Sequence, residues 1–191
     1  MKGAAYHHGD LRASLLRSAL ELVETTGSDQ LSLRSVARAA GVSPNAPYRH
    51  YADKDDLLAA VAVHGFQQVG ARIAAAAAQA GPDDRLVRVV SAAIHYAMAN
   101  PGLFHLMVSR VCGTNAAARA AARDVVVAVA EALEVDLGEP QGEALCTGIW
   151  AVVQGMSVLL VDGALKPHEG QDVDELIGSV VRATFGTWPR P

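Results

Sequence analysis

The chain has 191 residues, of which 51% are apolar and 19% charged, and its formal net charge is −4. This composition excludes an intrinsically disordered chain, and the acidic balance excludes a uniformly basic nucleic-acid coat protein. Apolar and polar residues do not alternate with the period of two that strands require, so the sequence predicts an all-α fold with about nine helices.

The first predicted helix extends from an N-cap at Asp10 to about Thr26, where Gly27 ends it. A short second helix follows, capped by Ser32 and ended by Gly41. The apolar residues of the first helix recur on one face, which we expect to be buried: Leu11, Leu15, Leu16, Ala19, Leu22 and Val23.

The stretch GVSPNAPYRHYADKDDLL, residues 41–58, predicts a third helix that is short and stiff. Ser43 is the predicted N-cap, and Pro44 occupies the first helical position, where its missing N–H has no intrahelical partner to lose. Pro47 occupies the fourth position and forfeits one bond to the cap carbonyl, which a helix tolerates only at its start. We therefore expect the N-terminal turn of this helix to be exposed.

Long helices rich in alanine and valine follow, the first of them capped by Asp53. Loops containing glycine, proline or asparagine separate them. The predicted ranges are 53–80, 83–100, 101–110, 115–135, 140–165 and 172–188.

The second and third helices have the spacing of a helix-turn-helix, whose second helix enters the major groove of DNA. Ala37 is small enough for the two helices to cross closely, Gly41 supplies the turn, and Val42 would fill the seam. Residues 30–54 contain four basic residues against one acidic residue, a local balance of +3. This basic patch on an acidic chain favours a nucleic-acid contact.

Residues 9–66, and above all AGVSPNAPYRHYADKDDLL, resemble the DNA-binding domain of the tetracycline-repressor (TetR) family of bacterial regulators. The resemblance implies an all-helical homodimer that binds double-stranded operator DNA through its N-terminal helices. It also implies a C-terminal domain that dimerises and usually holds a small effector. We expect the DNA-binding domain to occupy residues 1–55, with three helices, and the effector-binding and dimerisation domain to occupy residues 56–191.

Carried over to this chain, the resemblance assigns base contacts to Arg34 and to Pro44, Asn45 and Ala46 at the helix tip. Arg34 would read a guanine, Asn45 an adenine, and Pro44 or Ala46 a thymine methyl. The resemblance also assigns phosphate contacts to four residues: Ser32, Tyr48, His50 and Lys54. Two alternatives stay open, with Tyr48 as a partly buried core residue and His50 as a helix-end cap.

In the C-terminal half, small residues spaced four, three and four apart form a stripe that would let another helix approach closely. Together with the apolar face of the last helix, this stripe predicts a two-fold dimer interface. The residues are Ala144, Gly148, Ala151, Gly155, Leu176, Ile177 and Val180. Residues 144–161 contain no charge and are long enough to span a membrane, but flanking acids and internal polar residues favour burial in a protein interface.

A mixture of methionine, aromatic and histidine residues on otherwise aliphatic helices predicts a semi-apolar effector pocket, although each residue also fits an ordinary core. The candidates are Phe66, His95, Tyr96, Met98, Phe104, Met107, Trp150 and Met156. The segment WAVVQGM also resembles a subgroup of the family with a Trp and a following His-Gly, but Gln154 stands where that subgroup has His.

The sequence lacks the motifs that other functional classes require. No Glu is followed three residues later by His, and no Gly-x-Ser-x-Gly occurs, so we expect no enzyme and no cofactor. Adjacent His7 and His8 have no cluster of further ligands, so we expect no metal. The short polar N-terminus and two cysteines, predicted to be buried free thiols, indicate a cytoplasmic protein without a membrane segment. An effector-free helix-turn-helix protein remains the alternative.

Overall fold

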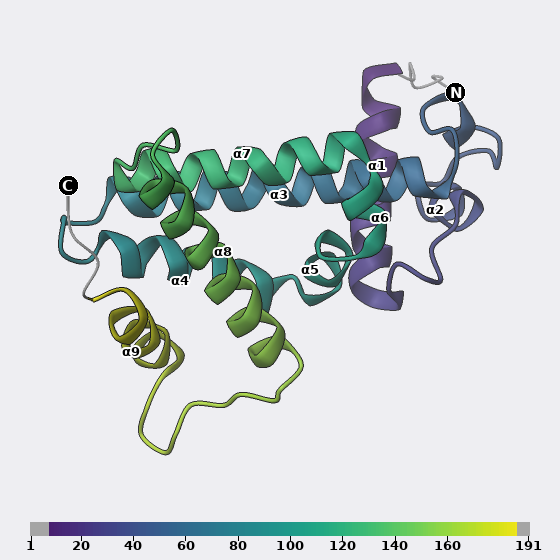
Figure 1. Cartoon of the computed structure of the whole chain (residues 1–191). Coiled ribbons are helices and arrows are strands. Elements are labelled where there is room, and N and C mark those ends of the chain that lie inside the picture. Colours follow the sequence, from purple (N-terminus) through teal and green to yellow (C-terminus); the bar gives the residue numbers. More distant parts are fainter. Residues whose placement is uncertain (1–7, 187–191) are drawn as a thin grey trace. The chain divides into compact units, whose positions relative to one another are not determined.

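The computed structural model describes residues 8–186, and this part of the chain is entirely helical, with nine α-helices, one 3-10 helix and no strand (Figure 1). The elements are α1 (His8–Thr26), α2 (Leu33–Ala39), η1 (Pro47–Arg49), α3 (Lys54–Ala78), α4 (Arg85–Ala99), α5 (Pro101–Met107), α6 (Arg110–Thr114), α7 (Ala116–Leu133), α8 (Pro140–Val161) and α9 (Val173–Phe185). The predicted fold class is confirmed.

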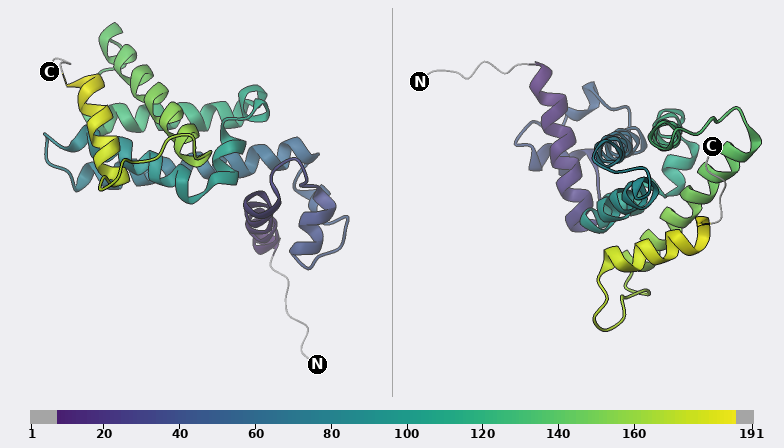
Figure 2. Two further views of the ribbon diagram at one scale, coloured as in Figure 1. Left: turned by 90° about the horizontal axis from the view of Figure 1, so that it is seen from below. Right: turned by 90° about the vertical axis from the view of Figure 1, so that its left-hand side faces the viewer.

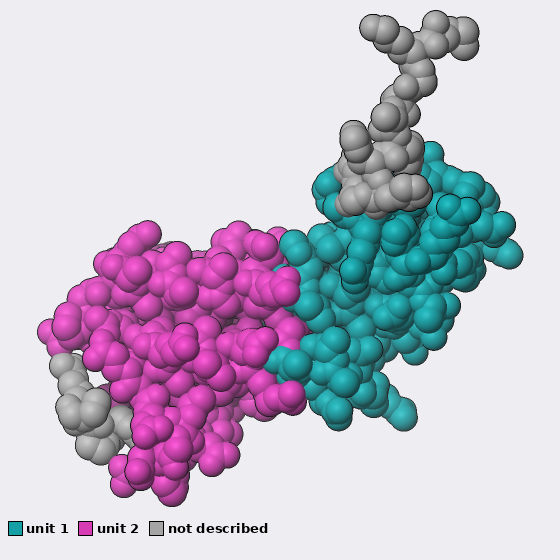
Figure 3. Space-filling model, turned by 90° about the horizontal axis from the view of Figure 1, so that it is seen from above, with its two compact units in different colours: residues 1–65, 102–120 teal, residues 66–101, 121–191 magenta. Residues whose placement is uncertain are grey.

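The chain forms two compact units, coloured separately in Figure 3. Unit 1 comprises residues 1–65 and 102–120, and unit 2 comprises residues 66–101 and 121–191. The boundary expected between residues 55 and 56 coincides with none of the three breaks, because α3 runs unbroken through that position and residues 102–120 return to unit 1.

In unit 1, α1 buries the face that its spacing predicts, with Leu15, Ala19 and Val23 fully inaccessible to solvent. The helix begins at His8, three residues before the start at Leu11 that an N-cap at Asp10 implies, so this predicted N-cap is wrong. An acidic residue is favoured throughout the first turn of a helix as well as at its cap, so the residue type alone does not fix the start. Gly27, with φ of 79°, ends α1 as predicted.

Helix α5 is fixed against α1 by Glu24. The backbone N–H groups of Gly102 and Leu103 donate to the Glu24 carboxylate at 3.0 and 2.8 Å. These are the otherwise unpaired donors of the first turn, and a carboxylate is their most favourable partner. The approach is close, since a Cβ atom on Gly102 would lie 2.4 Å from the carbonyl oxygen of Val23.

We therefore expect Gly102→Ala to destabilise the protein by about 1–3 kcal/mol, because the added methyl group meets rigid backbone. The melting temperature should fall by about 2–4 °C for each kcal/mol in a protein of this size. Gly113→Ala in α6 is the matched control, because a Cβ there meets nothing within 4 Å. Equal melting temperatures for the two variants in calorimetry would contradict the close contact.

In unit 2, α8 and α9 both pack on α4, as Figures 1 and 2 show. The contact buries aliphatic side chains from all three helices: Val89, Val90, Ile94, Leu145, Ile149, Ile177 and Val181. A capping box between Asp172 and Glu175 begins α9, and the Asp174 carboxylate is hydrogen-bonded to the His95 ring of α4 at 2.7 Å. These contacts fix α9 against α4.

Two predicted helix ends differ from the structure. The helix expected over 101–110 ends at Met107, and a separate α6 from Arg110 to Thr114 includes most of the CGTN segment expected to be a loop. No glycine or proline lies between α5 and α6 to indicate this break in the sequence. The Cys112 thiol donates to the Leu106 carbonyl across the break at 3.0 Å. Helix α8 ends at Val161 instead of Leu165 because Gly163, with φ of 72°, closes it. The predicted end of the last helix at Trp188 lies outside the described residues.

Both cysteines are free and buried, which confirms the prediction. Cys112 lies in unit 1 and Cys146 in unit 2. Burial raises the pKa of each thiol above its usual value, so both are neutral at physiological pH and poor nucleophiles.

Candidate nucleic-acid interface

The candidate interface is built on α2, which begins with a reciprocal capping box. The Ser32 hydroxyl accepts from the Ser35 N–H at 3.0 Å, and the Ser35 hydroxyl accepts from the Ser32 N–H at 2.9 Å. This exchange satisfies two donors that the helix start leaves unpaired. It also fixes the first turn of α2, where Ser32 remains exposed.

The turn after α2 confirms the roles predicted for Gly41 and Ala37. Gly41 has φ of 68°, a conformation that residues with a Cβ rarely adopt. The N–H of half-buried Val42 reaches back to the carbonyl of Ala37 at 3.0 Å, which closes the end of α2. Ala37 is itself 1% exposed, and α2 packs against η1. The two elements therefore cross closely, as a helix-turn-helix requires.

The second element differs from the α-helix predicted to start at Ser43. Residues 43–46 form a turn closed by the Ala46 N–H on the Ser43 carbonyl at 2.9 Å. A 3-10 helix follows from Pro47 to Arg49, with Pro47 at its first position. The physical reason is the missing N–H of Pro47, which cannot make the bond to the Ser43 carbonyl that an α-helix needs at this point.

The tip is nevertheless exposed, as predicted. Pro44 and Asn45 are exposed and Ala46 is half-buried. Tyr48 is 51% exposed, whereas Tyr51 is 2% exposed and packs in the core of unit 1. The tip is thus a short exposed segment on a rigid buried base.

Basic side chains flank this tip on several elements. Arg34 and Arg38 are exposed one helical turn apart on α2, and Arg49 is exposed at the end of η1. His50 is half-buried and occupies the C-cap position of η1. The arrangement provides several cationic groups around one exposed turn, which suits a polyanionic partner.

Lys54 has a partner within the chain. Its ammonium group donates to the carbonyl oxygen of Asp29 at 2.7 Å. An ammonium group has three donors, so two remain for a phosphate. The neighbouring acid Asp53 is occupied as the predicted N-cap of α3, accepting from the Asp56 N–H at 2.8 Å.

The residues predicted to form a dimer interface lie on different faces of unit 2. Ala144, Ala151 and Gly155 are exposed on α8, and Gly148 is half-buried. Ile177 is fully buried against the chain's own core, because α9 packs on α4, so this residue is not available to a partner. The other two predicted residues, Leu176 and Val180, are half-buried.

Exposed apolar side chains extend the surface of α8 beyond the predicted stripe. Trp150 is 56% exposed and Leu159 is 45% exposed. By length and composition, α8 is the one described helix that could cross a membrane, and only 28% of its apolar window is buried within the chain. An exposed apolar surface of this size on a helix indicates that another surface binds there.

The eight predicted pocket residues divide between the two units. Phe104 and Met107 belong to unit 1 and the other six to unit 2. Tyr96 and Met156 are buried, while His95 and Trp150 are exposed. The remaining two, Phe66 and Met98, are half-buried, so the set divides between core and surface.

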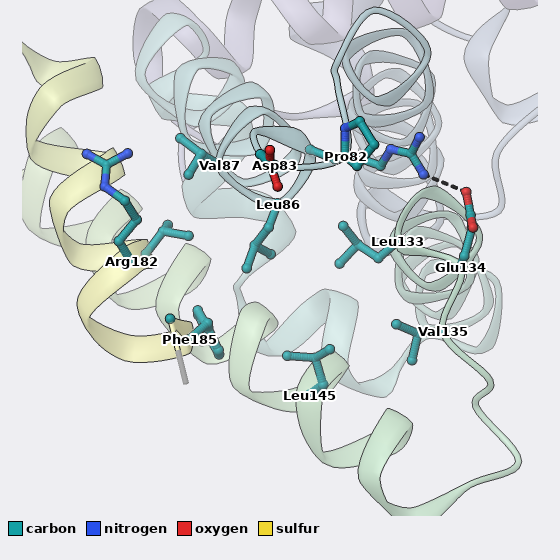
Figure 4. Close-up of a pocket in the computed structure, with 13 residues that line it drawn as sticks. Pro82, Asp83, Leu86, Val87, Leu133, Glu134, Val135, Leu145, Arg182 and Phe185 are labelled. Atoms are coloured by element: carbon teal, nitrogen blue, oxygen red, sulfur yellow. Dashed lines mark hydrogen bonds and ion pairs between the residues drawn. The ribbon is translucent and has the colours of Figure 1, made fainter. Parts of the chain in front are cut away.

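A cavity of about 350 Å³ lies elsewhere in unit 2, and sequence reasoning missed it (Figure 4). We call it the Leu86 cavity. Its lining residues are Pro82, Asp83, Arg85, Leu86, Val87, Leu133, Glu134, Val135, Leu145, Val181, Arg182, Phe185 and Gly186. They come from four helices, from the loops at 82–83 and 134–135, and from Gly186 after α9, and no spacing within one helix indicates that they meet.

Two family models match the chain. The model described as "Bacterial regulatory proteins, tetR family" matches residues 15–61, which include α2, the turn and η1. The model described as "Tetracyclin repressor-like, C-terminal domain" matches residues 86–184, more than half of the chain.

Solved structures share the fold over nearly the whole chain. A protein of unknown function from Rhodococcus sp. RHA1 is 29% identical, with a TM-score of 0.76, over 95% of this chain and 96% of that one. A TetR family transcription regulator from Marinobacter aquaeolei VT8 is 21% identical, with a TM-score of 0.63, over 91% and 94%. The fatty acid degradation regulator FadR from Bacillus halodurans is 14% identical, with a TM-score of 0.73, over 97% and 100%.

Proposed function

Because the chain belongs to the TetR family of bacterial regulatory proteins, we propose that it is a homodimeric, sequence-specific transcriptional regulator, acting as a repressor that a small effector releases from its operator. The observation that carries the proposal is the exposed tip at residues 44–46, held on buried Pro47 and Tyr51. A stiff exposed tip between cationic side chains fits the major groove of double-stranded DNA.

Within this proposal, the base contacts are made by Arg34 of α2 and by Asn45 at the tip. An Arg guanidinium pairs with the O6 and N7 atoms of guanine, and an Asn amide pairs with adenine. Pro44 and Ala46 would contact a thymine methyl. Phosphate contacts are proposed for Ser32, Tyr48, His50 and Lys54.

We propose that the second copy covers the exposed apolar face of α8. The face bears Ala151 and Gly155, which permit close approach, and Trp150 and Leu159, which supply apolar area. A two-fold dimer also doubles the base contacts, over half-sites about 34–36 Å apart. Burial of α8 in such an interface accounts for its apolar character without a membrane.

An effector releases the operator only if it binds more tightly to the dimer conformation that does not fit DNA. A hundredfold shift needs a difference of about 2.7 kcal/mol between the two conformations. We place this function in the cytoplasm, where operator DNA is found, and we propose no catalytic step. A regulator whose C-terminal domain serves only dimerisation is the competing proposal.

The direct test is to sequence the genomic DNA fragments retained by the purified protein. We expect a two-fold symmetric motif with half-sites one helical turn apart. Retained fragments without a common motif, or no retention in low salt, would refute sequence-specific binding.

For the phosphate role of Lys54, we expect Lys54→Ala to weaken binding to operator and unrelated duplexes alike. The slope of log K against log salt should fall by about one for each phosphate that is no longer neutralised. Fluorescence anisotropy over a range of salt concentrations measures both quantities. Lys166→Ala, which removes an exposed charge from unit 2, is the control, and a Lys54 variant that matches it would contradict the role. The melting temperature of the Lys54 variant must also be recorded, because the substitution removes the hydrogen bond to Asp29.

A further inference from the structure

The Leu86 cavity has an apolar interior. In Figure 4, Leu86, Leu133 and Leu145 converge on it from three helices, with Phe185 beside them. Its volume of about 350 Å³ lies near the lower end of the range for small-molecule sites. If each non-hydrogen atom needs about the room of a water molecule, about 30 Å³, the cavity holds roughly a dozen such atoms.

The polar groups at its edge leave hydrogen-bond donors unused. Arg85 Nη1 pairs with the Glu134 carboxylate at 2.6 Å, but the Nε atom of Arg85 is buried and has no partner among the described residues. A buried donor without an acceptor is unfavourable, so its presence at a cavity indicates a missing acceptor.

A second guanidinium lies at the opposite edge. Arg182 of α9 lines the cavity, and its guanidinium group lies back along α9 over Gly178. The two acids that line the cavity, Asp83 and Glu134, are both exposed, whereas the side chain of Arg85 is only 27% exposed. Arg182 is exposed as well, so water screens it as it screens the acids, and half-buried Arg85 is the least screened charge of the lining. The cavity therefore favours negative charge beside Arg85.

We propose that the Leu86 cavity binds a monoanionic amphipathic molecule of roughly a dozen non-hydrogen atoms. A carboxylate at its head accepts from Arg85 Nε, and its apolar body lies among Leu86, Leu133 and Phe185. Arg and carboxylate form charge-assisted hydrogen bonds, the strongest kind available to this lining. The binding site itself does not depend on the proposed function. Only the further statement that this molecule is the effector depends on it.

Calorimetric titration of the full-length protein at pH 7 tests the proposal with 4-phenylbutyrate, a soluble carboxylate of suitable size. The matched probe is 4-phenylbutan-1-ol, which keeps the apolar body but carries no charge. We expect the carboxylate to bind roughly tenfold more tightly than the alcohol. Equal affinities would overturn the assignment of an anion, and no heat from either compound at millimolar concentration would overturn the site.

Three variants locate the bound molecule. Arg85→Gln should weaken binding of the carboxylate roughly tenfold and leave the alcohol unchanged. Arg88→Gln, an equal change of charge at an exposed residue of α4 outside the lining, should change neither. Leu133→Trp should fill the cavity and abolish binding of both compounds while the protein still melts cooperatively. Unaltered binding to the Leu133 variant would place the molecule elsewhere and overturn the proposal.

These titrations contain no DNA, so they are independent of the proposed regulatory function. Failure to bind any operator would refute that function and leave the ligand site standing. Failure to bind the carboxylate would refute the ligand site and leave DNA binding standing.

Discussion

Replacement of Asn45 by alanine is expected to weaken operator binding by about 1–3 kcal/mol for each half-site. Asn45 is exposed at the tip, on a turn whose position is fixed by buried Pro47. Its amide is the one tip side chain that can pair with a base edge through both a donor and an acceptor. Because the substitution affects both half-sites of a two-fold dimer, its effect on the whole complex is about twice that on one half-site.

The effect should be specific to sequence. Anisotropy titrations with the operator and with operators changed one base pair at a time should show relaxed preference at one position in each half-site. Gln68→Ala, which removes an exposed amide from α3 in unit 2, should leave the preference intact. If Asn45→Ala weakens binding equally on all sequences, the side chain contacts the backbone of the DNA and reads no base.

Ala151→Glu is expected to convert the protein to monomers. Ala151 is exposed on α8 beside Trp150, on the face that we propose a second copy covers. In a two-fold interface the substitution buries two like charges together. An unpaired buried carboxylate costs about 3–5 kcal/mol, so dissociation should increase by more than a hundredfold.

Sedimentation equilibrium measures this change directly. Ala75→Glu places the same charge on an exposed position of α3 in unit 2 and should leave the association unchanged. Since Ala151 is exposed in the single chain, the folded monomer should retain its melting behaviour at low concentration. A dimer that survives the substitution would place the interface on another surface.

Local signals determined much of the helix-turn-helix from the sequence. Ser32, Gly41 and Asp53 act within a few residues of themselves, through capping and positive φ, so their roles could be predicted and the structure confirms them. The sequence did not determine whether the second element of the motif is an α-helix or a 3-10 helix. Two prolines are compatible with either an α-helix start or a turn followed by a 3-10 helix.

Contacts between residues far apart in the sequence could not be predicted from it. Lys54 carries the charge typical of a phosphate contact, but only the fold brings the Asp29 carbonyl to its ammonium group. Ile177 fits the apolar periodicity of an interface as well as that of a core, and only the packing of α9 on α4 assigns it to the core. Periodicity identifies an apolar face without identifying what covers it.

The sequence by itself determined the helical class, the location of the helix-turn-helix and the exposed tip, because caps, turn glycines and apolar spacing are properties of neighbouring residues. Only the tertiary structure decided that α5 is fixed on α1 by Glu24 and that Arg85, Leu133 and Arg182 surround one cavity. The reason is physical: a cavity and its unpaired donor arise where separate helices fail to fill the space between them. That mismatch depends on how helices pack, which no local pattern records.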